Sequence, residues 1–387
     1  MTAARIAYVS FDTVPAPKGA ATHIEAFARI LAAEFGGLEL VTVASGAEVT
    51  TSAERWPLVM HTELPALGES LIDRVLCFRR FLAQWLRGRR FEAIQFRSIF
   101  EGLPLLELAG ETKLVFEVNG LPSIELKYRY PGMEDDRELM RKIVSQERAC
   151  LEAASAVVTP SRVTANYLVT ERGVPADKIQ VVPNGVDHRI FMPERAAPSP
   201  VFRMIYFGTL APWQGVELGV RALAQVRAQL AATLTIIGSG SRWERNGLMS
   251  LAAKLGVGEA VSFLPAIPQA ELAKHVCGAD AVIAPLTLND RNVVQGCCPL
   301  KVLEGMAAGV PVITSDLQVV RELGCDGEHF VLVKPGSVDQ IAQAALRLAE
   351  DQELSARIGE QARRHVVDRF TWETAGRELV RVYEAFT

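Results

Sequence analysis

Residues 296–313 read Gly296-Cys297-Cys298-Pro299-Leu300-Lys301-Val302-Leu303-Glu304-Gly305-Met306-Ala307-Ala308-Gly309-Val310-Pro311-Val312-Ile313. Proline favours the first turn of a helix, and glycine favours the position after the last turn. A short helix is therefore predicted between Pro299 and Gly309, and the apolar residues that follow predict a buried strand over Pro311–Thr314. A loop, a helix and a buried strand in this order form one unit of an α/β sheet.

The same alternation of short β-branched runs and longer amphipathic stretches continues through all 387 residues. It predicts an α/β protein with two Rossmann-like, doubly wound domains. The Pro- and Ala-rich segment Glu194–Phe202 predicts the linker between a domain over residues 1–193 and one over residues 203–370. The expected strands are Arg5–Val9, Leu38–Val43, Phe91–Phe96, Lys113–Val118, Ala156–Thr159, Ile179–Val182, Arg203–Phe207, Thr233–Ile237, Ala260–Leu264, Ala281–Ala284, Pro311–Thr314 and Phe330–Val333. The expected helices include Thr22–Phe35, Asp135–Ala153, Glu353–Asp368 and Thr371–Phe386.

Composition and charge exclude several classes of protein. With 49% hydrophobic and 22% charged residues, the chain is neither disordered nor a small disulfide-stapled scaffold. The 41 basic and 45 acidic residues give a net charge of −4 and no basic module, which argues against a nucleic-acid partner. The six cysteines form no disulfide pattern, and we see neither a signal peptide nor an apolar run of about 18 residues. A cytoplasmic protein is therefore expected.

In open α/β sheets, ligands bind beyond the carboxyl ends of the strands, so the loops after the strands are informative. Lys18 and Gly19 precede the first helix, where small residues let a ligand approach free backbone N–H groups, and His23 follows one turn later. An ordinary capped loop has the same composition. In the second half, Gly208 and Gly238 each follow a strand and suggest a phosphate or nucleotide subsite. The glycine fingerprints of ordinary dehydrogenases and P-loop enzymes are absent from the sequence.

Lys301 and Glu304 lie one turn apart on the same face of the predicted helix after Pro299. A lysine in the first turn opposes the helix dipole, which makes sense if an anion binds there. A carboxylate at Glu304 could accept hydrogen bonds from both hydroxyls of a ribose. A surface ion pair worth about 0.3 kcal/mol explains the same spacing equally well.

Several segments resemble a known family, and they occur in that family's order along nearly the whole chain. They are Lys18–His23, Thr159–Ser161, Val182–Asp187, Phe207–Leu210 with Gly215, Gly278–Asp280, Leu303–Val312, Glu322 and Phe370–Glu373. Together they resemble the retaining glycosyltransferases of family 4. The resemblance implies the GT-B fold, in which two Rossmann-like domains face a central cleft and a C-terminal helix, here residues 371–387, crosses back to the N-terminal domain.

The resemblance also implies roles for residues, with three departures. Glu304 matches the carboxylate that holds the donor ribose, but a second family carboxylate falls on Gly296. The two cations that usually neutralise the donor diphosphate fall on Thr209 and Gln214, and the usual histidine near the reacting sugar falls on Asn119. We therefore expect replacement cations to serve the diphosphate. The expected donor-binding residues are Gly208, Thr209, Gln214, Gly238, Arg291, Cys298, Leu300, Lys301 and Glu304. The expected catalytic residues are Lys301, Asn119 and Glu117, and the residues expected on the acceptor or diphosphate side are Lys18, Gly19 and His23.

The resulting hypothesis is metal-independent transfer of a sugar from a nucleotide diphosphate sugar to an acceptor hydroxyl, in polysaccharide or glycolipid assembly, without a further cofactor. A nucleotide-sugar epimerase of the same fold and a non-catalytic nucleotide-sugar-binding protein are the alternatives. The stretch Leu71–Arg90 alternates arginines with apolar residues. It predicts either a helix that lies against a membrane surface near a lipid-linked acceptor or a core-packed helix with a basic outer side.

Overall fold

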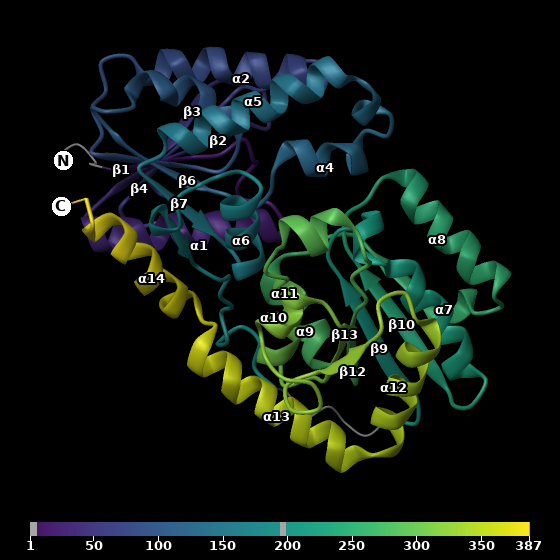
Figure 1. Ribbon diagram of the computed structural model, residues 1–387. Coiled ribbons are helices and arrows are strands. Elements are labelled where there is room, and N and C mark those ends of the chain that lie inside the picture. The colour runs from purple at the N-terminus through teal and green to yellow at the C-terminus, as the bar shows by residue number, and fades with distance from the viewer. Residues whose placement is uncertain (1–5, 194–198, 387) are drawn as a thin grey trace.

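The computed structural model describes residues 6–193 and 199–386. Arg5 of the first expected strand and residues 194–198 of the expected linker lie outside this range. Each half of the chain forms one sheet with helices on both of its faces (Figure 1). The structure therefore confirms the α/β class and the doubly wound arrangement of both halves.

The N-terminal domain contains an eight-stranded sheet in the order β3-β4-β2-β1-β5-β6-β7-β8, parallel except for β3. Two of its strands were not predicted. β3 is an exposed edge strand without apolar residues, and β4 carries His61 and Glu63 among its apolar residues. The strands are β1 Ile6–Val9, β2 Leu38–Val43, β3 Thr50–Ser52, β4 Val59–Leu64, β5 Ala93–Phe96, β6 Lys113–Glu117, β7 Ala156–Thr159 and β8 Ile179–Val181.

The C-terminal domain contains a six-stranded parallel sheet in the order β11-β10-β9-β12-β13-β14. The strand order reverses beside β9, and the crevice at such a switch point is where doubly wound sheets bind ligands. Phe202, expected in the linker, already belongs to β9. The strands are β9 Phe202–Phe207, β10 Ala232–Ile237, β11 Val261–Leu264, β12 Ala281–Ala284, β13 Val312–Ser315 and β14 Val331–Val333.

Helices fill the connections between these strands (Figure 1). The N-terminal domain has α1 Gly19–Phe35, α2 Leu71–Leu86, α3 Ile99–Gly102, α4 Pro122–Arg129, α5 Arg137–Ala153 and α6 Arg162–Thr170. The remaining helices are α7 Val216–Arg227, α8 Arg242–Lys254, α9 Gln269–Cys277, α10 Leu300–Ala307, α11 Gln318–Arg321, α12 Val338–Glu350, α13 Gln352–Arg369 and α14 Trp372–Glu384. Short helical turns are η1 Leu103–Leu108, η2 Met133–Asp135, η3 Ala176–Lys178, η4 Pro212–Gln214, η5 Gly258–Ala260 and the π-helical turn η6 Arg291–Gln295.

Both faces of each sheet are buried. Alternate residues of a strand point to opposite faces, and both sets pack into hydrophobic clusters. In β9, Met204 and Tyr206 join one hydrophobic cluster while Ile205 and Phe207 join another. The strands of the N-terminal sheet divide between two clusters in the same way. This explains why the strands of both sheets read as nearly continuous apolar runs.

The last helix, α14, crosses back to the N-terminal domain, as expected (Figure 1). Its apolar face joins the cluster that contains Phe27 of α1, and Tyr383 donates a hydrogen bond to Gln95 of β5 over 2.6 Å. Where the chain crosses, the backbone N–H of Val186 donates to the carbonyl oxygen of Phe370 over 2.9 Å. The two domains are therefore joined by two passages of the chain that lie side by side.

Candidate functional site

Lys301 and Glu304 lie on α10 at the carboxyl edge of the C-terminal sheet, and each is only 7% exposed. The Lys301 ammonium lies 4.5 Å from the ring centroid of Tyr206, and it donates hydrogen bonds to the Tyr206 hydroxyl and to the side-chain oxygen of Gln214. Burial lowers the pKa of Lys301 to about 7. Burial also raises the pKa of Glu304 to about 7. The hydrogen bond that Gln269 donates to Glu304 over 3.1 Å acts in the opposite direction and lowers this pKa. These residues are therefore no surface ion pair.

The two glycine loops of the C-terminal domain lie directly against Lys301. Phe207 and Ile237 are partners in neighbouring strands, so the glycines that follow them, Gly208 and Gly238, meet at the sheet edge. A Cβ atom at Gly238 would lie 1.7 Å from the carbonyl oxygen of Gly208, so this position excludes any side chain. A Cβ atom at Gly208 would lie 3.7 Å from the Lys301 ammonium. The structure thus brings together Gly208, Gly238, Lys301 and Gln214, with Thr209 next to Gly208 in the same loop.

Glu117, at the end of β6, lies at the centre of a buried network in the N-terminal domain. Its carboxylate accepts hydrogen bonds from Tyr8 over 2.5 Å, from Gln95 over 2.6 Å, from Arg97 over 3.0 Å and from Asn119. Burial acts to raise the pKa of Glu117, but the charges and hydrogen bonds around it, His23 and Arg97 first, lower it to about 2. Glu117 is an anion whose oxygens are already engaged, and it orients the groups around it.

The predicted residues of the first loop lie at the boundary between the two domains. The Lys18 ammonium pairs with Asp12 over 2.8 Å, and Asp12 also pairs with Arg97 over 3.0 Å. A Cβ atom at Gly19 would lie 3.0 Å from the Leu300 side chain, so this loop reaches the first residue of α10. Arg97 had not been predicted, although it directly follows β5, where the rule about loops after strands would have found it.

Arg291 lies in η6 and connects the two domains. Its Nε atom donates to Glu125 of α4 over 3.1 Å, and its guanidinium lies 5.6 Å from the ring centroid of Trp213. Asp290 accepts a hydrogen bond from Tyr128 and pairs with Lys127 over 2.5 Å. The predicted diphosphate cation is thus engaged with a carboxylate of the other domain. No sequence signal pointed to α4, because its contacts join residues more than 160 positions apart.

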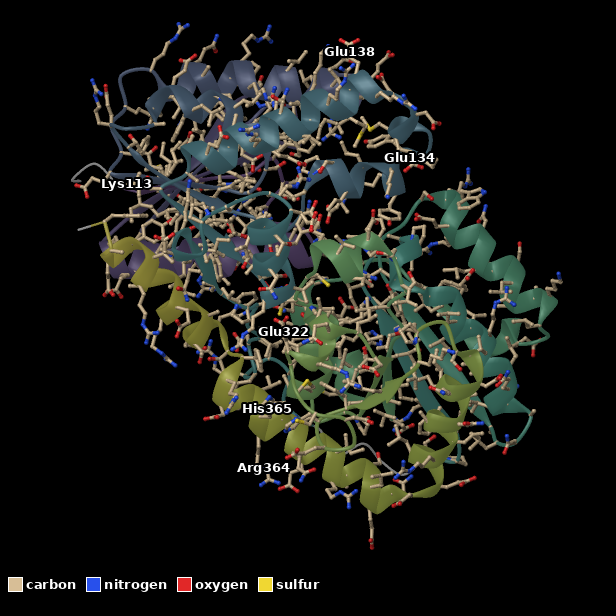
Figure 2. The ribbon with its side chains drawn as sticks, in the orientation of Figure 1. Lys113, Glu134, Glu138, Glu322, Arg364 and His365 are labelled. Atoms are coloured by element: carbon tan, nitrogen blue, oxygen red, sulfur yellow. The ribbon has the colours of Figure 1, made fainter. Side chains whose placement is uncertain are left out.

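Gly296 explains one departure from the family pattern. Its φ of +83° favours glycine, and a Cβ atom would lie 2.9 Å from the hydroxyl oxygens of Ser161 and Thr164 in the N-terminal domain. A glutamate has no room there. Beside this contact, the carboxylate of Glu322 accepts hydrogen bonds from the backbone of Arg162 and Val163, and so caps α6 from the other domain (Figure 2).

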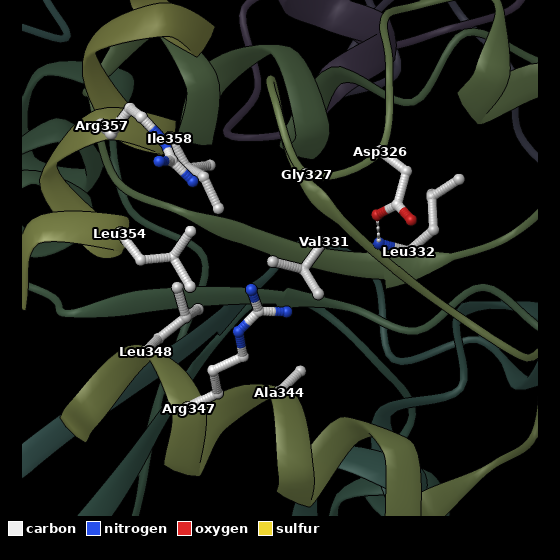
Figure 3. Close-up of a pocket in the computed structure, with 10 residues that line it drawn as sticks. All are labelled: Asp326, Gly327, Val331, Leu332, Ala344, Arg347, Leu348, Leu354, Arg357 and Ile358. Carbon is white, nitrogen blue, oxygen red and sulfur yellow. Dashed lines mark hydrogen bonds between the residues drawn. The ribbon is translucent and has the colours of Figure 1, made fainter. Parts of the chain in front are cut away.

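Two other features lie apart from these residues. Among the described residues, one group could offer three metal ligands, Cys325, Glu328 and His329, in the turn before β14. The Nδ1 atom of His329 there accepts a hydrogen bond from the backbone N–H of Cys325. Nε2 therefore carries the proton of the neutral ring, which does not suit metal binding. A cavity of about 180 Å³ lies between that turn, α12 and α13, with Arg347 and Arg357 at its wall (Figure 3). None of the predicted site residues lines it.

Two doubly wound domains that meet at α10, with a crossing C-terminal helix, define the GT-B class of fold. Comparison with known families supports this class. A family model described as Glycosyltransferase Family 4 matches residues 17–189, and one described as Glycosyl transferases group 1 matches residues 188–365. The chain belongs to family 4 of the glycosyltransferases.

Curated relatives carry the names of several glycosyltransferases. The chain is 28% identical to an MMP alpha-(1->4)-mannosyltransferase of Mycolicibacterium hassiacum, over 62% of this chain and 56% of that protein. It is 29% identical to a D-inositol 3-phosphate glycosyltransferase of Stackebrandtia nassauensis, over 67% of this chain and 60% of that protein. It is also 29% identical to a GDP-mannose-dependent alpha-(1-6)-phosphatidylinositol monomannoside mannosyltransferase of Mycolicibacterium smegmatis, over 58% of this chain and 61% of that protein. The matched region thus spans less than two thirds of the length of each of these relatives.

Solved structures share the fold over nearly the whole chain. Sucrose-phosphate synthase from Thermosynechococcus elongatus has a TM-score of 0.80 at 21% identity, with 98% of both chains covered. HepE of Anabaena, solved in complex with UDP and glucose, has a TM-score of 0.76 at 17% identity, covering 98% of this chain and 99% of that one. WaaG, described as a glycosyltransferase involved in lipopolysaccharide biosynthesis, has a TM-score of 0.73 at 14% identity, covering 97% and 99%. These likenesses concern the fold.

Within residues 6–193 and 199–386, every helix is too short or too polar to traverse a lipid bilayer.

Proposed function

We propose that the protein transfers a glycosyl group from a nucleoside diphosphate sugar to an acceptor hydroxyl, with retention of the anomeric configuration, in polysaccharide or glycolipid assembly. The observation that carries the proposal is the pair Lys301 and Glu304, buried on one face of α10 beside the Gly208 loop at the switch point of the C-terminal sheet. A buried cation and a buried carboxylate one turn apart match the diphosphate and the ribose of such a donor. The names of the curated relatives, one of them described as GDP-mannose-dependent, support the donor class.

Lys301 and the start of α10 stabilise the leaving diphosphate. Negative charge grows on this group as the glycosidic bond breaks, and fixed positive groups nearby lower the barrier. Without an anion, burial holds the pKa of Lys301 at about 7, well below the usual value of a lysine. A bound diphosphate favours the ammonium form and raises this pKa. The free backbone N–H groups at the first turn of α10 add further positive potential for the diphosphate. Pro299 contributes none, because proline has no backbone N–H.

Glu304 holds the ribose through its two carboxylate oxygens. The hydroxyl groups of a ribose donate to the charged form, so nucleotide binding lowers the pKa of Glu304 from about 7. To the acceptor side we assign Asn119, whose amide donates a hydrogen bond to Glu117, together with Lys18 and Gly19. The leaving phosphate oxygen takes the proton of the acceptor hydroxyl, so the proposed reaction has no separate general base and includes no metal ion or cofactor.

Nucleotide binding and product analysis test this function. We expect one of UDP, GDP or ADP, or a sugar derivative of it, to raise the melting temperature, since a ligand at 100 times its Kd adds about 2.7 kcal/mol to the free energy of unfolding. Glu304→Ala should abolish the shift, whereas Glu271→Ala, an exposed glutamate on α9, should retain it. Full affinity in Glu304→Ala, or no shift with any nucleotide, contradicts the proposal. With the donor known, product analysis separates retaining transfer from epimerisation and from binding without turnover.

A membrane surface is the proposed partner on the acceptor side. The inner face of α2 packs into the core through Val75, Phe78 and Leu82. Its outer face exposes Ile72 and Leu76, which are 52% and 56% exposed, as well as Arg80, and Arg87 is exposed directly after the helix. The core-packed interpretation therefore applies to the inner face, and membrane contact of the outer face stays a prediction. We propose that the outer face contacts anionic lipid when the acceptor is lipid-linked.

A further inference from the structure

His23, Asn184 and Cys298 form a line of contacts from the first helix of the N-terminal domain to the entrance of α10. The Nδ1 atom of His23 lies 2.7 Å from Oδ1 of Asn184, and Nδ2 of Asn184 donates to the carbonyl oxygen of Cys298 over 2.7 Å. The side chains of His23 and Asn184 are both buried. No step of the proposed reaction uses this line, although it ends just before the helix that carries Lys301.

Hydrogen bonding determines the orientation of each group in the line. Because the Cys298 carbonyl can only accept, the amide nitrogen of Asn184 points toward it and the amide oxygen points toward His23. Nδ1 of His23 must then carry a proton. Nε2 lies 2.7 Å from a carboxylate oxygen of Glu117, so the ring is held between Asn184 and Glu117.

The backbone of Asn184 is held in place by the crossing of the chain. A Cβ atom at Gly185 would lie 2.4 Å from the backbone nitrogen of Trp372, and Val186 donates to the Phe370 carbonyl. Asn184 therefore has little freedom to follow α10 if that helix moves. The Asn184 side chain is therefore fixed between His23 on one side and the Cys298 carbonyl on the other.

We infer that His23 and Asn184 are positioning residues, which hold the Cys298 carbonyl and with it the first turn of α10 at a set place relative to the N-terminal domain. This inference rests on the proposed function, because glycosyl transfer is the reason why α10 needs a fixed position. Lys301 belongs to one domain and Asn119 to the other, so the position of α10 decides whether the donor meets the acceptor correctly. A misplacement of about 1 Å in such a geometry costs about 100-fold in rate.

Asn184→Asp is the sharpest variant for a test. Aspartate keeps an oxygen that accepts from His23, but it replaces the amide donor with an oxygen that repels the Cys298 carbonyl. Thr42→Val is the matched control, because it breaks a buried side-chain hydrogen bond of 2.8 Å, to His61, between two strands of the same domain. A general loss of stability in that domain should affect both variants.

The first measurement is hydrogen–deuterium exchange of the segment 297–304 in the full chain without ligand. We expect exchange at least about tenfold faster in Asn184→Asp than in the wild type or in Thr42→Val. Unchanged exchange overturns the inference, and so does equal acceleration in Thr42→Val. This measurement needs no donor, so its failure is distinct from a failure of nucleotide binding. Long-range ¹H–¹⁵N NMR spectra should show a proton on Nδ1 of His23, and an unprotonated Nδ1 contradicts the arrangement.

The second measurement uses the nucleotide sugar that stabilises the wild type. In Asn184→Asp we expect the Kd for that donor to change less than about threefold, since Lys301 and Glu304 are intact. The rate of donor turnover should fall about 30- to 100-fold, because the two domains no longer hold the reacting groups in register. Parallel losses of affinity and rate, or no loss of rate, overturn the positioning role.

Discussion

Two ionisable side chains of this protein, Lys301 and Glu304, are buried. Lys301 and Glu304 were predicted as functional residues from their spacing and from the family resemblance, and the structure adds that both are buried with pKa values of about 7. Sequence spacing alone left open a surface ion pair, and burial excludes it. The anion-binding role stays a prediction, but the cost of burying these groups without a ligand is a physical reason to expect one.

Replacing Lys301 should raise the stability of the folded protein and lower its affinity for the donor. The folded state holds the pKa of Lys301 well below its value of 10.5 in the unfolded chain. As pH falls from 10.5 towards 7, the unfolded chain gains a proton that the folded protein does not bind, so this lysine costs stability most fully below pH 7. Lys301→Met should therefore raise the free energy of unfolding by about 1–3 kcal/mol at pH 7 and by less at pH 9.5.

Chemical unfolding at the two pH values and nucleotide titration check this prediction. Donor affinity should fall at least about tenfold in Lys301→Met, which removes about 1.4 kcal/mol of binding free energy. The control Lys254→Met replaces an exposed lysine of α8 and should change neither quantity. A destabilised Lys301→Met protein that still binds nucleotide at full affinity would show that Lys301 is a structural residue.

Among the elements, α10 was predicted closely and α2 was left between two interpretations. The proline and glycine at the ends of α10 are local signals, which act through the backbone conformation of the residues themselves. The partners of α2 are not local. Its pattern is compatible with a core face and with a membrane face, and only the packed domain distinguishes the buried Phe78 from the exposed Ile72 and Leu76.

The outer face of α2 should carry the contact with anionic lipid. We expect the wild-type protein to float with liposomes that contain anionic lipid, because basic and exposed apolar side chains lie together on this helix. The double variant Arg80→Glu/Arg87→Glu should lose most of that flotation. The variant Arg364→Glu/Arg369→Glu changes the net charge by the same amount and should still float, because both arginines are exposed on α13, far along the chain from α2. Arg364 is labelled in Figure 2. Unchanged flotation in the α2 variant, or none in the wild type, rules out the contact.

At the scale of the molecule, the domains are held in close contact at several points beside α10. Gly296 fits against Ser161 and Thr164, Glu322 caps α6, and Arg291 pairs with Glu125 of α4. None of these pairings was predicted, although Glu322 belongs to the family pattern. Each joins residues on different domains, so no local sequence pattern records them.

Gly296→Ala should open the contact between the domains. Its Cβ atom would lie 2.9 Å from two hydroxyl oxygens of the other domain, and its φ is strained for alanine. We expect a larger radius of gyration in solution X-ray scattering and a loss of about 1–3 kcal/mol of stability. Gly256→Ala is the control, since it has a similar φ of +71° with no atom within 4 Å, and it should lose stability only through backbone strain. An unchanged radius in Gly296→Ala would show that this contact does not set the domain arrangement.

The amino-acid sequence was enough to predict the two α/β domains, the course of α10 and the crossing of the last helix. These follow from periodicity, helix-end residues and a family resemblance that extends along the chain. The support of the site became visible only in the folded protein: neighbours engage the carboxylate of Glu117, Arg291 pairs across the domains, and a line of contacts runs from His23 to Cys298. The physical reason is that burial and hydrogen bonding depend on groups that folding brings together from distant parts of the chain, and these groups decide which charges are free to meet a ligand.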